Sequence, residues 1–321
     1  MFDALPCSLR MRHLLARTAT AALLLIIGSL SMPEPAQASD WRPLCKGSSP
    51  ASYPVVKRTT LAGVPAILRI PEQIRKPPIV LWHGFGPPAS EEAMMDALPL
   101  DEVDAVKVYL GLPLFGARAL AGGTKELARR QSEDIGLQVF KPVVVGAGDE
   151  LPDVVAALQR GACMQRDGSI NLIGFSAGGA AALYALAQGG VRVDAAVLIN
   201  TSTGLSESVK AYERATKQAY AWSPASRELA QKTDAADRAA DIASARPALL
   251  FLSGKADFVV DTDAISEVYE KLKPYYRNDD SRLQWKAMPA MPHQWAADPR
   301  SLASVRKATA QWFTDLSGLP Q

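Results

Sequence analysis

Short apolar runs alternate with longer helical patterns along most of the chain. The apolar runs predict strands at residues 55–59, 65–70, 79–82, 105–109, 170–173, 195–199, 248–252 and 283–288. The last six runs are almost continuously hydrophobic, which is typical of parallel strands covered on both faces. Helical patterns lie between them at residues 125–135, 152–160, 177–187, 263–272 and 302–313. This alternation predicts an α/β fold: a doubly wound, mostly parallel sheet with helices on both faces.

One long segment interrupts the alternation. Residues 201–246 lie between two predicted strands and contain no strand-like run, only Ala-rich, charge-laced helical sequence. A connection of this length is longer than a single crossover helix needs. We expect a small helical cap inserted over the carboxyl edge of the sheet. A plain crossover helix with a long loop is the alternative.

The first 38 residues have the pattern of a secretory signal peptide. Arg10, Arg12 and Arg17 precede an apolar stretch, and the small residues Ala36 and Ala38 follow it. The apolar stretch spans about 13 residues, whereas a transmembrane helix needs roughly 20. We expect cleavage after Ala38, export to the periplasm or the medium, no membrane span after cleavage, and one mature domain at 39–321. An uncleaved membrane anchor is the alternative.

Cleavage after Ala38 would also set the number of cysteines in the mature chain. It removes Cys7 and leaves Cys45 and Cys163 in the mature chain. An oxidising compartment favours the pairing of two remaining thiols. We therefore expect a disulfide that fixes the N-terminal tail to the domain, with two unpaired thiols as the alternative.

Composition and charge exclude several classes of protein. The 321 residues are 48% hydrophobic and 21% charged, which excludes low-complexity disorder and collagen. A formal net charge of +2 gives no electrostatic reason to expect a nucleic-acid partner. No C-x-x-C pair indicates a zinc site. We expect neither a metal nor an organic cofactor, and nothing in the sequence predicts the oligomeric state.

The strongest chemical motif is Gly174-Phe175-Ser176-Ala177-Gly178, placed between a predicted buried strand and a small-residue helix. A sharp strand-to-helix turn holds the central serine in a strained conformation, and the glycines let neighbouring backbone approach. The hydroxyl group then projects at the carboxyl edge of the sheet, on a helix N-terminus that favours developing negative charge. We predict that Ser176 is a nucleophile. A tight turn without catalytic function is the alternative.

From about residue 55 to its end, the chain resembles the α/β-hydrolase family. A second motif of this resemblance is His83-Gly84-Phe85-Gly86, which follows a predicted buried strand. In the family this loop supplies half of the oxyanion hole. The resemblance therefore implies that the backbone N–H groups of Phe85 and Ala177 stabilise the oxyanion. His83 is expected to bond the loop backbone rather than to take part in catalysis.

The other two members of a catalytic triad are expected later in the chain. Asp257 follows a predicted strand in a Gly-x-x-Asp-x-x-Val pattern that resembles the family's site for the triad carboxylate, with Asp261 and Asp263 as rivals. The chain has three histidines; one leaves with the signal peptide and His83 precedes the nucleophile. His293 is therefore the expected base, in the family's order of serine, acid and histidine. Asp257 would orient the imidazole and stabilise the imidazolium ion.

These residues predict acyl transfer in two steps. His293 takes the proton of Ser176, which attacks a carbonyl carbon, and water later releases the acyl group. We expect an exported serine hydrolase that cleaves a small-molecule carboxylic ester, because an ester requires only a triad, an oxyanion hole and an apolar pocket. A peptidase or thioesterase on the same fold is the first alternative. A non-catalytic binding protein that retains the fold is the second.

Overall fold

The computed structural model describes residues 44–45 and 52–316 of the chain. The predicted signal peptide, its cleavage site and Cys7 lie outside the described residues.

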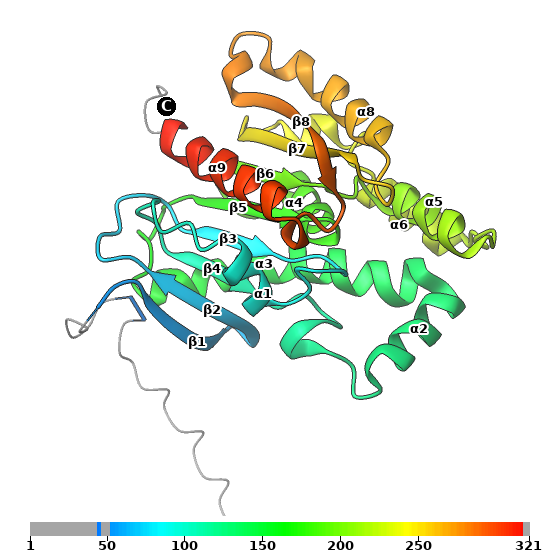
Figure 1. Cartoon of the computed structure of the whole chain (residues 1–321), viewed down its shortest axis with the longest axis horizontal. Coiled ribbons are helices and arrows are strands. Elements are labelled where there is room, and N and C mark those ends of the chain that lie inside the picture. Colours follow the sequence, from blue (N-terminus) through cyan, green and yellow to red (C-terminus); the bar gives the residue numbers. More distant parts are fainter. Residues whose placement is uncertain (1–43, 46–51, 317–321) are drawn as a thin grey trace, which may run out of the picture. The chain divides into compact units, whose positions relative to one another are not determined.

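An eight-stranded sheet organises this part of the chain (Figure 1). Its strands, in chain order, are β1 (Val55–Leu61), β2 (Val64–Ile70), β3 (Ile79–Trp82), β4 (Lys107–Leu110), β5 (Ile170–Phe175), β6 (Val193–Ile199), β7 (Ala248–Ala256) and β8 (Leu283–Pro292). Their order in space is β1-β2-β4-β3-β5-β6-β7-β8. β2 is antiparallel to both of its neighbours, β1 and β4, and the six strands from β3 to β8 are parallel. The predicted α/β fold and its six parallel strands are confirmed.

Most strands differ by a few residues from the hydrophobic runs that predict them. β7 and β8 extend to Ala256 and Pro292, because their backbone pairing continues beyond their buried residues. β4 begins two residues later than expected. Ala105 and Val106 are buried but precede the strand, in a turn where the Ala105 N–H group donates to the carbonyl oxygen of Val103. Burial alone therefore does not mark the start of a strand.

Helices cover both faces of the sheet. α1 (Glu91–Ala97) and α9 (Pro299–Asp315) lie in front of it in Figure 1, and α3 (Gly146–Arg160) and α4 (Ala177–Gln188) lie behind it. α8 (Thr262–Leu272) packs on the same face as α3 and α4. The side chains of β3 alternate between the two cores. Val80 and Trp82 join the core under α3 and α4, and Ile79 and Leu81 join the core under α1 and α9.

The connection from β4 to β5 is more elaborate than the sequence pattern indicates. α2 (Gly123–Asp134) continues into the π-helical segment η2 (Ile135–Val145), which contains Pro142 and leads directly into α3. Short 3₁₀ helices complete the described elements: η1 (Gly116–Arg118), η3 (Lys273–Tyr276), η4 (Asp280–Arg282) and η5 (Trp295–Ala297).

Residues 201–246 hold three helices and no strand. These are α5 (Leu205–Thr216), α6 (Pro224–Thr233) and α7 (Ala239–Ile242). α6 and α7 pack against α4, and α5 contacts α6 and η2. Buried Leu205, Val209 and Leu229 join the core on the α4 face of the sheet.

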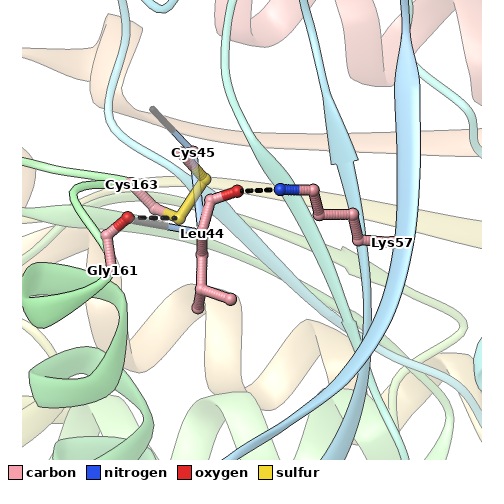
Figure 2. The surroundings of a disulfide bond; sticks show 5 residues. All are labelled: Leu44, Cys45, Lys57, Gly161 and Cys163. Atoms are coloured by element: carbon pink, nitrogen blue, oxygen red, sulfur yellow. Dashed lines mark hydrogen bonds between the residues drawn. A yellow bond between two sulfur atoms is a disulfide. The ribbon is translucent and has the colours of Figure 1, made fainter. Parts of the chain in front are cut away.

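A disulfide joins Cys45 to Cys163, and the two Cα atoms lie 5.0 Å apart (Figure 2). The Cys45 N–H group donates to the carbonyl oxygen of Gly161, 3.1 Å away, at the end of α3. The carbonyl oxygen of Leu44 accepts from Nζ of Lys57 on β1 at 2.7 Å. Residues 44–45 are thus held to both α3 and β1, in agreement with the disulfide that the cysteine count predicts.

Candidate active site

The chain turns from β5 into α4 at Ser176. The φ angle of Ser176 is 53° and its ψ angle is −117°, a strained conformation for a residue with a side chain. The Ser176 N–H group donates to the carbonyl oxygen of Ile199 on β6, and the Ser176 carbonyl oxygen accepts from the amides of Gly179 and Ala180 in α4. These bonds hold the turn, so the predicted strand–turn–helix context of the motif is present.

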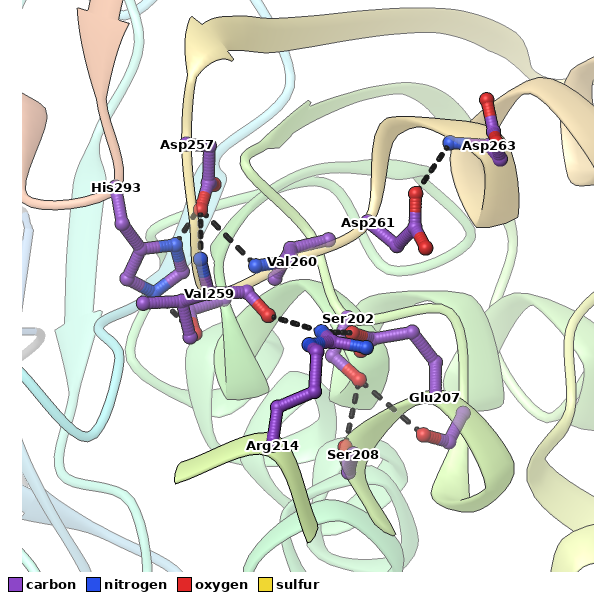
Figure 3. A network of polar contacts seen from close by, with 12 residues as sticks. Ser202, Glu207, Ser208, Arg214, Asp257, Val259, Val260, Asp261, Asp263 and His293 are labelled. Atoms are coloured by element: carbon purple, nitrogen blue, oxygen red, sulfur yellow. Dashed lines mark hydrogen bonds and ion pairs between the residues drawn. The ribbon is translucent and has the colours of Figure 1, made fainter. Parts of the chain in front are cut away.

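Three of the predicted side chains meet in one hydrogen-bonded line. Nε2 of His293 lies 3.0 Å from Oγ of Ser176. Nδ1 of His293 lies 2.8 Å from Oδ2 of Asp257 (Figure 3). The side chains of His293 and Asp257 are 11% and 3% exposed. A neutral imidazole in this line donates its Nδ1 proton to Asp257, which leaves Nε2 free to accept the proton of Ser176. The arrangement is that of a nucleophile, a base and an orienting acid.

The loop after β7 fixes the orientation of the Asp257 carboxylate. Its Oδ1 atom accepts from the backbone amides of Val259 at 2.8 Å and Val260 at 2.9 Å, which leaves Oδ2 for His293. The two rival carboxylates lie further along the chain. Asp261 is the N-cap of α8 and accepts from the amide of Asp263, which is exposed. Neither rival hydrogen-bonds His293.

A buried amide side chain that the sequence analysis did not single out holds the histidine loop. Asn200 follows β6 and is 0% exposed. Its Nδ2 atom donates to the carbonyl oxygens of Pro292 at 2.9 Å and His293 at 3.1 Å, and its Oδ1 atom accepts from the amide of Gly254 at 2.8 Å. Asn200 thereby joins the ends of β6, β7 and β8. The available signal was a polar residue placed immediately after the apolar run 195–199.

The predicted oxyanion donors are both free to bind a ligand. Neither the Phe85 nor the Ala177 amide donates a hydrogen bond within the described part of the chain. A Cβ atom on Gly84 would lie 2.7 Å from Cε1 of Phe175 and 3.0 Å from Cβ of Ser176. Because Gly84 has no side chain, the backbone of this loop can lie directly against Phe175 and Ser176.

Three other glycines of the two motifs differ in their surroundings. A Cβ atom on Gly178 would lie 2.4 Å from the carbonyl oxygen of His83, so α4 also depends on a missing side chain. Gly174 likewise packs against the backbone of Gly178. Gly86 has more room, since its nearest neighbour would be the flexible amide of Gln294 at 3.4 Å.

His83 lies inside the loop and away from the triad. It is 0% exposed, its Nδ1 atom lies 2.8 Å from the carbonyl oxygen of Gly84, and its Nε2 atom accepts from the amide of Leu112. Burial lowers the pKa of His83 from 6.5 to about 4. The imidazole is therefore neutral at pH 7 and bonds the loop backbone.

A sequence model of the prolyl oligopeptidase family matches residues 149–319, just over half of the chain. The match contains Ser176, Asp257 and His293, in the order of serine, acid and histidine that the sequence predicts. The chain belongs to the prolyl oligopeptidase family. The loop at 83–86 precedes the range that this family's model matches. No curated protein sequence matches the chain.

Solved structures show the same fold as this member of the prolyl oligopeptidase family. TT1662 from Thermus thermophilus matches with a TM-score of 0.60 and 21% identity, over 81% of this chain and 98% of its own. Dipeptidyl peptidase 4 from Porphyromonas gingivalis matches with a TM-score of 0.57 and 16% identity, over 82% of this chain and 36% of its own. The esterase PF2001 from Pyrococcus furiosus matches with a TM-score of 0.54 and 14% identity, over 81% of this chain and 89% of its own. The chain thus spans about a third of the length of the Porphyromonas peptidase.

Together, the family match, the fold and the triad identify a serine hydrolase with the α/β-hydrolase fold. Within residues 44–45 and 52–316, no three His, Cys, Asp or Glu side chains gather to hold a metal ion. Among the helices of those residues, none combines the length and the apolar character that crossing a lipid bilayer requires.

Proposed function

We propose that the protein is an exported hydrolase of small-molecule carboxylic esters that works through an acyl group on Ser176. The observation that carries this proposal is the line from Asp257 through His293 to Ser176, with bonds of 2.8 and 3.0 Å. Two unpaired backbone amides, those of Phe85 and Ala177, accompany it. Such an arrangement stabilises a tetrahedral intermediate on the serine.

The reaction follows from these positions. Nε2 of His293 accepts the Ser176 proton as Oγ attacks the carbonyl carbon, and the new oxyanion binds the Phe85 and Ala177 amides. His293 then gives its proton to the departing alcohol, and Ser176 retains the acyl group. A water molecule, deprotonated by His293, attacks the acyl group and releases the acid. Asp257 keeps the imidazole in the required tautomer throughout.

Apolar side chains on both loops beside the triad support an ester with an apolar acyl group. Phe258 and Val259 follow the acid directly and are 91% and 47% exposed. On the oxyanion loop, the Phe85 ring stacks on Phe115 with 4.7 Å between ring centroids. Exposed or partly exposed apolar groups beside a reactive serine offer contact to a hydrocarbon chain. The helices of residues 201–246 are proposed as the cap that limits the size of this chain.

A peptide or peptide-like amide is the second candidate substrate, and the family match favours it. An amide demands more of the same residues than an ester does. Its leaving amine has to be protonated by His293 before the bond breaks, whereas many alcohols leave readily. The two substrates therefore differ in how strongly they depend on the position of the histidine.

The test compares an ester and an anilide that share one acyl group. Nitrophenyl esters of two to twelve carbons and the matching nitroanilides are assayed with the wild type and with Ser176→Ala. We expect kcat/KM for the ester to exceed that for the anilide by at least 100-fold, and both activities to vanish in the variant. A higher kcat/KM for aminoacyl anilides would assign the peptidase instead. Ester turnover that survives Ser176→Ala would refute the acyl-serine mechanism.

Export is tested separately. Expression of the whole chain in a bacterium, followed by fractionation and N-terminal sequencing, is expected to give a periplasmic protein that begins at Ser39. An intact Met1 in the membrane fraction would contradict cleavage and favour an anchor.

A further inference from the structure

Helix α5 contains a buried carboxylate close to the catalytic acid. Glu207 lies in the first turn of α5, and its side chain is 5% exposed. Its Oε1 atom lies 3.8 Å from Nη2 of Arg214, seven residues later on the same helix, and accepts no hydrogen bond. Figure 3 shows the two side chains reaching toward the loop that carries Asp257.

Arg214 connects this carboxylate to the loop. Its Nη2 atom donates to the carbonyl oxygen of Val259 at 2.8 Å. The amide of the same Val259 donates to Oδ1 of Asp257 at 2.8 Å. Val259 thus accepts a hydrogen bond from Arg214 of α5 through its carbonyl oxygen and donates one to the triad acid through its amide.

The groups around Glu207 have opposite effects on its pKa. Burial raises the pKa of Glu207 to about 7, and the negative charge of Asp257 acts in the same direction. The Ser202 hydroxyl group, the Asp261 amide and the Arg214 guanidinium favour the ionised form. At the C-cap of the neighbouring α6, Asp234 accepts from the amide of Ser206, and burial raises the pKa of Asp234 as well.

An ionised carboxylate in this buried position destabilises the folded state. Removing an ionised group from water costs several kcal/mol unless partners compensate it, and Oε1 of Glu207 lacks a hydrogen bond. Glutamine has the same shape and carries no charge. Packing therefore does not explain the charge of Glu207. The hydrogen bonds from Arg214 to Val259 and from Val259 to Asp257 give this charge a role in the site.

We propose that ionised Glu207, acting through Arg214, is a positioning residue that holds the Asp257 loop in its catalytic arrangement. The inference rests on the proposed triad chemistry. Glu207 touches neither the substrate nor the reacting atoms. Its charge keeps the guanidinium group of Arg214 directed at Val259, and Val259 in turn keeps Asp257 directed at His293.

The proposal has a consequence for the pH dependence. As pH falls through about 7, Glu207 takes up a proton and its attraction for Arg214 disappears. His293 also has to be neutral to act as a base, so acid lowers kcat/KM through two groups. Protonation of His293 removes all activity and gives a limiting slope of log kcat/KM of about 1. Protonation of Glu207 removes only part of the activity, so it adds a further ~10-fold fall around pH 7.

The central experiment measures kcat/KM against pH with a nitrophenyl ester in the wild type and in Glu207→Gln. We expect the variant to lack the additional ~10-fold fall around pH 7, and its kcat at pH 8 to lie roughly 10-fold below that of the wild type, with KM within about twofold. Glu207→Asp, which retains an ionising group, should restore part of kcat and part of this fall. Glu267→Gln is the matched control, because it removes an exposed carboxylate from α8, the helix after the same loop.

Stability separates positioning from a merely structural role. The pKa of Glu207 is higher in the folded chain than its ordinary value of 4.5, so ionisation weakens the fold as pH rises through about 7. Glu207→Gln should therefore unfold at the same temperature as the wild type or above it at pH 8, although it turns over more slowly. A loss of Tm in step with the loss of kcat, with the additional fall around pH 7 still present in Glu207→Gln, would overturn the proposal.

Arg214 provides a second test if Glu207 variants fold poorly. Its side chain is 44% exposed, so replacement leaves no large cavity. Arg214→Lys should retain more activity than Arg214→Met, and Arg214→Met should abolish the effect of Glu207→Gln. Wild-type kcat and pH dependence in both Glu207→Gln and Arg214→Met would refute the inference. If Ser176→Ala is also active, the proposed function itself has failed; if Ser176→Ala is inactive, only the positioning role has failed.

Discussion

Gly84 lies where one added methyl group tests the oxyanion hole without removing any hydrogen-bonding group. In Gly84→Ala the new Cβ atom would lie 2.7 and 2.8 Å from two ring carbons of Phe175, and 3.0 Å from Cβ of Ser176. Carbon atoms pack at about 3.5–4.0 Å, so the loop or the ring has to move by ~1 Å. Phe175 is 0% exposed and its ring centroid lies 5.2 Å from that of His293.

Both ways of relieving this clash affect the chemistry. If the loop moves, the Phe85 amide leaves the oxyanion, and losing one such donor typically costs about 100- to 1,000-fold in kcat. If Phe175 moves, it displaces His293, and misplacement by ~1 Å can cost about 100-fold. We therefore expect kcat to fall by about 100-fold or more. KM should change little, because the lost interaction belongs to the transition state.

Gly86→Ala is the matched control in the same loop. Its Cβ atom would meet only the side-chain amide of Gln294 at 3.4 Å, and the φ angles of Gly84 and Gly86 both lie outside the left-handed region. The assay is steady-state hydrolysis of a nitrophenyl ester, with circular dichroism to confirm folding and a fluorophosphonate probe to measure the reactivity of Ser176. A folded Gly84→Ala enzyme with kcat within threefold of wild type would refute the assigned oxyanion loop. An equal loss in Gly86→Ala would do the same.

Three further predictions concern the surroundings of the site. Because burial lowers the His83 pKa from 6.5 to about 4, the folded state should lose ~3 kcal/mol as pH falls from 6.5 to 4, and urea unfolding of His83→Asn should lack this component. Cys163→Ser should lower the free energy of unfolding by about 2–5 kcal/mol, and thiol titration of the denatured mature protein should find no free thiol, since Cys45 pairs with Cys163. Asn200→Ala should cost about 2–4 kcal/mol, because it removes three hydrogen bonds to backbone groups at the ends of β7 and β8, and should lower kcat at temperatures where the protein remains folded, because the His293 loop loses its anchor.

The parts of the fold that follow from local pattern were predictable from the sequence. The apolar runs that become β3 to β7 are continuous because both faces of those strands are covered. β8 lies at the edge of the sheet and is mostly exposed or half-buried, so the expected coverage on both faces is wrong for this strand. The triad candidates were identifiable because each has a local context: Ser176 lies in a strand-to-helix turn, Asp257 follows the buried strand β7, and His293 follows the last strand. The disulfide followed from counting cysteines rather than from geometry.

Other features depend on neighbours that the local sequence does not specify. η2 contains Pro142, which ordinarily interrupts a helix, and its π-helical backbone continues through that residue because the segment packs against α4 and α6. No periodicity of hydrophobic residues predicts this outcome. The short α1 was missed for a related reason, since seven residues are too few to display a helical period.

The polar residues that follow β6 show why residues that position the catalytic groups are harder to predict than the catalytic residues themselves. Asn200 and Glu207 are buried polar residues without a motif. Asn200 bonds backbone groups 54 to 93 positions away in the sequence. Glu207 reaches the acid loop through Arg214, which bonds Val259, 45 positions further along. Both act at the carboxyl edge of the sheet, where the ends of parallel strands bring distant loops together. A buried polar residue at such an edge has to find partners in those loops, because leaving it unpaired costs free energy. A polar residue directly after an apolar parallel strand is therefore a candidate for positioning the catalytic loops, even where its partners remain unknown.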